Sequence, residues 1–182
     1  RDLHLSLRRQ RQMCIRDSSK NVMIEAIKNT DARVKNNQSK TPGFLIAALL
    51  WPELLKECVS TEEINIRKFF RSMDKVLKRQ QIKIAIPRKF YNYIKDIWVL
   101  QLKLHSRIGN QPYKTLKHPR FRAAYDFMLV RERAANVRKG PGNWWEKFQL
   151  NDQALRSKLI NSLKEKNEED SFKKFGFSEE LR

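Results

Sequence analysis

Lysine and arginine are the residues of this sequence whose type and spacing point to a chemical role, which is the binding of anions. The stretch KTLKHPRFRAAYDFMLVRERAA, residues 114–135, carries a proline followed by two arginines on either side of a phenylalanine, then apolar residues at helical spacing, then two more arginines. Cationic side chains along a helix bind phosphate oxygens, and each phosphate that they neutralise releases counterions from a nucleic acid. The stretch therefore predicts a helix that forms one wall of a groove for a phosphate backbone.

The charge of the whole chain agrees with this interpretation. The 182 residues include 39 Lys+Arg against 20 Asp+Glu, which gives a net charge of +19 and a pI of about 10.2. The net charge is +3 on residues 1–18, +16 on residues 19–142 and zero on residues 143–182. Such a balance favours nucleic acid first and an anionic membrane second. No apolar run approaches the ~18 residues of a membrane span, so we expect no membrane partner and a cytoplasmic location.

The predicted nucleic-acid contacts are thirteen basic residues and one tryptophan. They are Arg88, Lys89, Lys95, Lys103, Arg107, Lys114, Lys117, Arg120, Arg122, Arg131, Arg133, Arg138, Lys139 and Trp144. Two alternatives stay open. Trp144 could stack on a base or pack in the core beside Trp145. Arg122 could instead be a buried structural arginine that pairs with Asp126 one helical turn later.

Catalytic chemistry has no candidate in this sequence. Nucleotidyl transfer needs carboxylates that hold a divalent metal beside a phosphate-binding loop, but the chain has no Asp-x-Asp, no Gly-Gly pair and no P-loop. Cys14 and Cys58 form no CxxC pair, and the three histidines do not have zinc-site spacing relative to them. His118, before a proline, is expected to cap or pack. We therefore predict no catalytic residue, metal or cofactor within this chain.

The spacing of apolar residues predicts an all-α fold, a compact bundle of about six to seven helices followed by a mobile C-terminal tail. Pro52 is expected to bend or split the second helix, and RIGNQP, residues 107–112, is expected to be a turn. The predicted helices cover residues 20–37, residues 44–59, a helix that opens at the capping box Ser60–Glu63 and ends near 86, residues 87–106, the helix after Pro119, the segment from Trp144, and residues 152–166.

Apolar residues at helical spacing are predicted to face the core. They include Val22, Ala26, Ile27 and Val34, then Trp51, then Ile66, Phe69, Phe70, Met73, Val76 and Leu77, then Phe90, Ile94, Ile97, Trp98 and Leu102 or Leu104, and finally Phe121, Ala124, Tyr125, Met128 and Leu129.

The chain divides into three parts. Residues 1–18, which include RRQRQMCIRDS, resemble a translated sequencing adaptor. We expect them to lie outside the fold, disordered or as an arbitrary helix. Residues 19–150 are expected to form the helical body, and residues 151–182 a helix end with a flexible, charge-balanced tail.

Several segments, taken in order, resemble one known family. They are IEAIKNTDARVKNN, TPGFLIAALLWPELL, IPRKFYNYIKDIWVLQLKL, KTLKHPRFRAAYDFMLVRERAAN and WWEKFQ. Over about residues 19–150 the chain is similar to the C-terminal body of the bacterial poly(A) polymerase I family, in the class II nucleotidyltransferase superfamily. HPRFRAAYD with DIW upstream is the most specific part of the match.

The resemblance implies an RNA-binding helical body that accompanies a nucleotidyltransferase head. In the family the head carries Gly-Gly and Asp-x-Asp motifs and adds AMP from ATP to RNA 3′ ends with Mg²⁺. Neither motif occurs here, so we expect the chain alone to be inactive and its partners to be single-stranded RNA 3′ ends and that head. The family often has an Arg-rich tail, whereas residues 151–182 are charge-balanced, which moves the expected RNA contacts to residues 67–139.

Three other interpretations remain open at this point. The first is the body of a CCA-adding tRNA nucleotidyltransferase, although the segment HPRFRAAYD favours the poly(A) polymerase family instead. The second is a basic helical scaffold in which RNA has no part. The third is a helix-turn-helix DNA-binding protein, for which the sequence shows no short helix–Gly–helix unit. The oligomeric state is left open.

Overall fold

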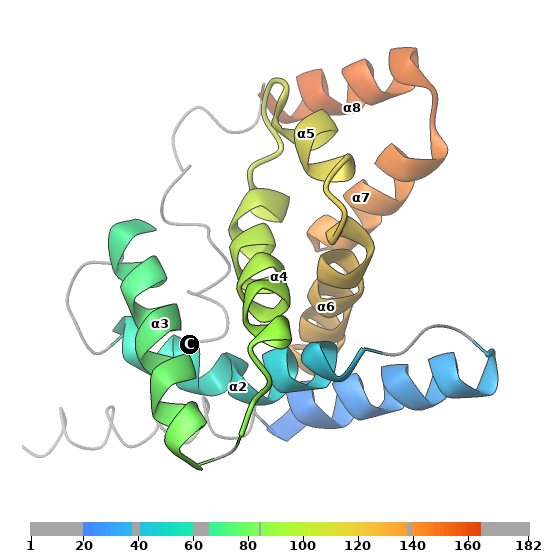
Figure 1. Cartoon of the computed structure of the whole chain (residues 1–182). Helices are drawn as coiled ribbons and strands as arrows, with labels where there is room; N and C mark the ends of the chain where they lie inside the picture. The colour runs from blue at the N-terminus through green and yellow to red at the C-terminus, as the bar shows by residue number, and fades with distance from the viewer. Residues whose placement is uncertain (1–19, 38–40, 60–65, 84, 138–139, 165–182) are drawn as a thin grey trace, which may run out of the picture.

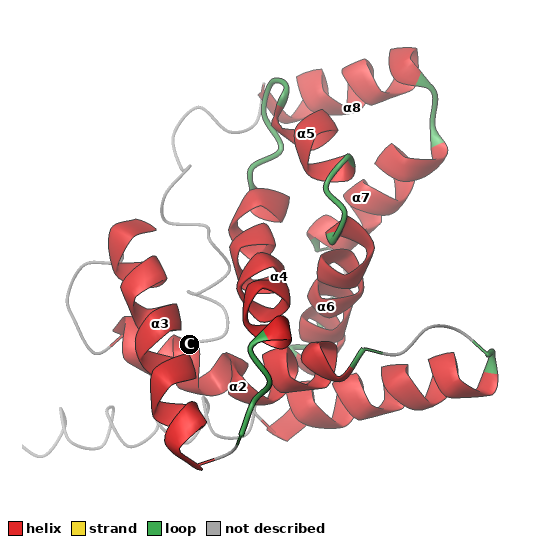
Figure 2. Ribbon diagram, in the orientation of Figure 1, coloured by secondary structure: helices red, strands yellow, loops and turns green. Residues whose placement is uncertain are grey.

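The computed structural model describes residues 20–37, 41–59, 66–83, 85–137 and 140–164. Within these ranges every regular element is a helix (Figure 2), which confirms the all-α prediction. The elements are a first helix at residues 20–35, α2 (Pro42–Val59), α3 (Ile66–Lys83), α4 (Lys89–His105), α5 (Gln111–Leu116), α6 (Phe121–Ala134), α7 (Pro141–Leu150) and α8 (Gln153–Lys164).

Prolines mark several of the helix starts, as expected for a residue that lacks the backbone N–H that a first turn leaves unused. Pro42 begins α2, Pro112 lies in the first turn of α5, and Pro141 begins α7. Pro52 lies inside α2, which continues past it as one helix, so of the predicted bend or split the split does not occur. The short α5 falls partly on the predicted turn and was not predicted. The capping box Ser60–Glu63 and residues 165–182 lie outside the described ranges.

Helices α4 and α6 lie side by side at the centre of the bundle (Figure 1). On one side, α2 and α3 enclose a first apolar cluster around Trp51, Phe69 and Trp98. On the other side, α7 and α8 enclose a second cluster around Trp145 and Phe148. Burial of such rings stabilises a fold by about 25 cal/mol per Å² of apolar surface. The two central helices contribute side chains to both clusters and thereby hold the two halves together.

A buried polar network links α4 to α6. The side-chain amide of Gln101 donates to the carbonyl oxygens of Ile97 (3.1 Å) and Ala124 (3.0 Å). Its Oε1 accepts a hydrogen bond of 3.2 Å from Nη1 of Arg131, whose guanidinium lies 4.4 Å from the ring centroid of Trp51. Buried polar groups that find such partners stabilise one arrangement of the helices over others.

Most predicted core residues are buried, including Trp51, Trp98 and four of the five residues on the α6 face. Leu129 is half-buried. The prediction is wrong for Ile66 and Phe70 of α3 and for Ile27 and Val34 of the first helix, which are exposed. Helix α3 packs chiefly against α2, and a helix with one main neighbour buries only a narrow stripe of its surface.

No helix in the described part of the chain is both long enough and apolar enough to cross a membrane.

Candidate nucleic-acid interface

Six of the predicted contacts are exposed basic side chains, and the described part of the chain gives them no carboxylate partner. They are Arg88, Lys89, Lys103, Lys114, Lys117 and Arg120. They lie on α4, on α5 and on the two turns that precede α4 and α6, and we call them the open cations. Charges of this kind are the ones that can exchange their counterions for phosphates.

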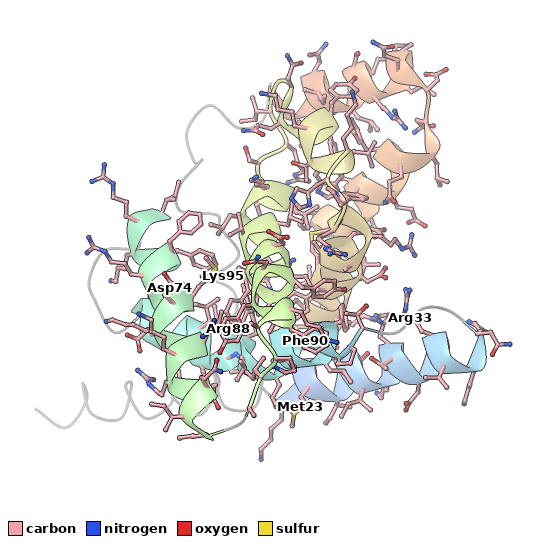
Figure 3. The ribbon with its side chains drawn as sticks, in the orientation of Figure 1. Met23, Arg33, Asp74, Arg88, Phe90 and Lys95 are labelled. Carbon is pink, nitrogen blue, oxygen red and sulfur yellow. The ribbon has the colours of Figure 1, made fainter. Side chains whose placement is uncertain are left out.

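Three further predicted contacts pair with acidic side chains. Nζ of Lys95 lies 2.6 Å from Oδ1 of Asp74 across α3 and α4 (Figure 3). Nε of Arg133 lies 3.8 Å from a Glu25 oxygen, and Nε of Arg122 lies 3.2 Å from Oδ1 of Asp126. The predicted Arg122–Asp126 pair is therefore confirmed, but the predicted burial of Arg122 is wrong. Arg122 remains 69% exposed, so the pair leaves much of its guanidinium at the surface.

The structure contradicts Arg131 as a surface contact. Its relative exposure is 5%, and it holds Gln101 and covers Trp51 inside the bundle. Residues Arg138 and Lys139 lie outside the described ranges.

Trp144 belongs mainly to the second apolar cluster. Its ring stacks on Phe148 with centroids 4.8 Å apart and planes 13° apart, and its Nε1–H donates to the Leu159 carbonyl at 3.3 Å. The half-buried Arg107 guanidinium lies 5.6 Å from the Trp144 ring centroid, and burial lowers the pKa of Arg107. These contacts support packing for Trp144, while Trp145 is fully buried.

A cavity of about 180 Å³ opens between the first helix, the start of α2, α4 and the start of α6. Its lining includes Arg33, Tyr93, Arg120 and Arg122, with Asp126 among them. We call it the arginine pocket. Sequence reasoning missed Arg33, which Figure 3 labels on the first helix, because nothing local distinguishes it from other surface arginines.

Two side chains, Asp126 and Tyr93, hold the arginines of this pocket in place. The buried Asp126 accepts from Nη1 of Arg33 at 3.0 Å and pairs with Arg122, so one carboxylate orients two guanidinium groups. Burial raises the pKa of Asp126, and the two arginines oppose that shift. The guanidinium of Arg120 lies 4.9 Å from the ring centroid of Tyr93. The lining thus holds three guanidinium groups and one carboxylate, which leaves the pocket cationic.

A second hollow, of about 320 Å³, lies between α3 and α4. Lys95, Lys103 and His118 are among its lining residues. Nδ1 of His118 accepts a hydrogen bond of 3.1 Å from the backbone N–H of Arg120, so this histidine stabilises the turn before α6 and does not cap the helix itself. His118 borders this hollow and Pro119 borders the arginine pocket, so the turn before α6 lies between the hollow and the pocket.

His105, at the end of α4, gives the fold a pH dependence that can be measured. Burial, together with the charges of Arg131 and Arg107, lowers its pKa from 6.5 to about 3. The unfolded chain therefore binds a proton on His105 that the folded chain rejects between those two pH values. Folding stability from this group is present above pH ~6.5 and is lost as the pH falls toward 3.

We expect the free energy of unfolding to fall by about 2–3 kcal/mol more for the parent chain than for His105→Gln between about pH 7 and pH 4.5. Urea unfolding at both pH values, followed by circular dichroism, measures the difference. The comparison between the two proteins cancels other titrating groups, including Asp126 and Glu132, whose pKa values burial raises. Parallel pH profiles for the two proteins would contradict the expectation.

The sequence matches known proteins across most of its length. The family model described as "Polymerase A arginine-rich C-terminus" matches residues 62–175, which extends beyond residue 150, where the resemblance was expected to end. The chain is 34% identical over 151 residues to "Poly(A) polymerase I" of Escherichia coli O157:H7, which covers 79% of this chain and 32% of that protein.

Two other relatives give the same result. "Poly(A) polymerase I" of Salmonella typhi is 31% identical over 148 residues, covering 78% of this chain and 32% of the relative. The Haemophilus influenzae protein of the same name is 32% identical over 147 residues, which cover 76% of this chain and 32% of that protein. The chain thus spans about a third of the length of these curated relatives. With 114 of its residues inside the family model, this chain belongs to the polymerase A arginine-rich C-terminus family.

Proposed function

We propose that this chain is the RNA-binding part of a bacterial poly(A) polymerase, which adds AMP from ATP to RNA 3′ ends with Mg²⁺ in the cytoplasm. The chain holds single-stranded RNA near its 3′ end. The transfer itself, with ATP and Mg²⁺, is assigned to the part of the relatives that this chain does not cover.

The observation that supports this proposal is the group of open cations on α4, on α5 and on the turns before α4 and α6. The relatives of this chain are named poly(A) polymerases. Phosphate contacts position a nucleic acid and carry little sequence information. A surface of this kind suits a protein that accepts many different RNA ends. The RNA then passes along α4 and the His118–Pro119 turn, which lie between the arginine pocket and the second hollow.

Replacing all six open cations by glutamine is expected to weaken the binding of a single-stranded RNA by at least about 100-fold at low salt. The reason is the loss of six phosphate contacts and of the counterions that they release. Filter binding measures both affinities, with a duplex DNA of equal length alongside. We expect the parent chain to prefer the RNA.

A matched control changes the net charge by the same amount elsewhere. It replaces six exposed basic residues of other surfaces, Lys20, Lys35, Lys78, Lys83, Lys147 and Lys158. The affinity of this variant for the RNA should fall by less than about 5-fold, because only the long-range electrostatic field of the protein has changed. Equal losses in both variants would show that bulk charge, and no particular surface, holds the RNA. Tighter binding of duplex DNA would overturn the choice of RNA.

A further inference from the structure

The arginine pocket is built from parts of the chain that lie far apart in sequence. Its lining is drawn from four segments, at residues 29, 30 and 33, at 41 and 44, at 93, and at 119, 120, 122, 123 and 126. Arg33 and Asp126, which are 93 positions apart, meet there at 3.0 Å. An isolated surface arginine does not need a tertiary contact of this kind to hold its side chain. The contact therefore indicates that the fold itself positions the arginines of this pocket.

The chemistry of the lining selects an anion with several acceptor oxygens. Arg33 and Arg122 are oriented by the Asp126 carboxylate, and the exposed Arg120 lies against the Tyr93 ring. A guanidinium presents paired N–H donors that match a phosphate better than an ammonium group does. With one carboxylate among three guanidiniums, the pocket retains net positive charge for a ligand to neutralise.

The size of the pocket restricts the ligand further. Its volume of about 180 Å³ is below the ~300–1,000 Å³ of pockets that enclose a whole small-molecule ligand. A single phosphate group fits this space, while the groups attached to it remain outside. A polynucleotide has one phosphate group of this kind between each pair of neighbouring nucleosides.

We propose that the arginine pocket binds one phosphodiester group of a bound RNA strand, with Arg120 and Arg122 donating to its oxygens. This inference rests on the proposed function, since it names where that RNA is held. It makes Arg120 different from the other open cations, because Arg120 alone among them lines the pocket. The Asp126 carboxylate acts as a positioning group and makes no contact with the RNA.

The test uses substitutions that conserve charge. Arg120→Lys keeps the positive charge but removes the planar pair of donors, and Arg88→Lys makes the same change at an open cation outside the pocket. We expect Arg120→Lys to weaken the binding of a single-stranded oligoadenylate by about 5–10-fold and Arg88→Lys by less than about 2-fold. Both positions are exposed, so folding should be unaffected, and circular dichroism checks this.

Nuclear magnetic resonance locates the ligand directly. The dinucleotide ApA, which has one phosphodiester, and the oligoadenylate should both shift the side-chain Nε–H signals of Arg120 and Arg122, while the Arg88 signal moves less. Inorganic phosphate is titrated in parallel. Shifts with inorganic phosphate but not with ApA or the oligoadenylate would assign the pocket to a free anion and overturn the proposal.

The other results separate this inference from the proposed function. Equal effects of the two Arg→Lys substitutions, with RNA still bound by the parent chain, would overturn the pocket assignment and leave RNA binding standing. Failure of the parent chain to bind the oligoadenylate at low salt would overturn both.

Discussion

Raising the salt concentration from about 50 to about 200 mM is expected to weaken the binding of single-stranded RNA to this chain by about 300-fold. The slope of log affinity against log salt is about −0.7 for each phosphate neutralised on a single strand. Six open cations therefore give a slope near −4, and a fourfold rise in salt then lowers the affinity by between two and three powers of ten. Filter binding at four or more salt concentrations measures the slope.

The expected slope depends on which cations are counted. Lys95, Arg122 and Arg133 already lie beside carboxylates, so their charges have partners before RNA arrives and contribute fewer released ions. Arg131 is buried and contributes none. Counting all thirteen predicted basic contacts would instead give a slope near −9. The measured slope thus tests the structure's division of these residues as well as the binding itself.

The variant in which the six open cations are glutamine is the control for this measurement. Its slope should be about −1 or shallower, while a neutral osmolyte at matched osmolality should leave the affinity of the parent chain unchanged. A slope near −1 for the parent chain would contradict the expectation, because base stacking or another uncharged contact would then supply most of the affinity.

Much of the fold could be predicted from the sequence because the helices carry their own signals. Apolar spacing locates most helix starts within a few residues, whereas Pro112, which lies in the first turn of α5, was expected in a turn. The core of α6 was also predictable. The exposure of Ile66 and Phe70 could not be predicted. It depends on how many helices pack against α3, which is a property of the assembled bundle. Helix α5 has six residues, too few for a period to show.

The candidate site was less predictable, for a related reason. The Arg122–Asp126 pair could be seen at i,i+4 spacing, but Asp74–Lys95 and Arg33–Asp126 join segments that only the tertiary structure brings together. Arg131 did carry a signal. It continues the buried stripe of Ala124 and Phe127 along α6, so its helical position indicated burial even though its residue type indicated a surface.

Trp145→Ala is expected to lower the free energy of unfolding by about 3–5 kcal/mol. The side chain is fully buried, with its ring centroid 5.4 Å from that of Phe121 and 5.6 Å from that of Phe148. Its Nε1–H donates to the Leu104 carbonyl at 2.8 Å and so joins α7 to the end of α4. Truncation leaves a cavity in the second apolar cluster and removes the partner of that carbonyl. Urea unfolding followed by circular dichroism measures the loss.

Trp145→Phe separates the two contributions, because it keeps a ring in the cluster and removes only the donor. It should cost less, about 1–2 kcal/mol for the carbonyl left without its partner and for the smaller ring. A loss below about 1 kcal/mol for Trp145→Ala would contradict the packing of α7 on the central helices. The open cations lie on α4, α5 and the turns that precede α4 and α6, outside the second cluster's interior. RNA affinity should therefore survive in the folded fraction of either variant, which makes stability and binding separable properties of this chain.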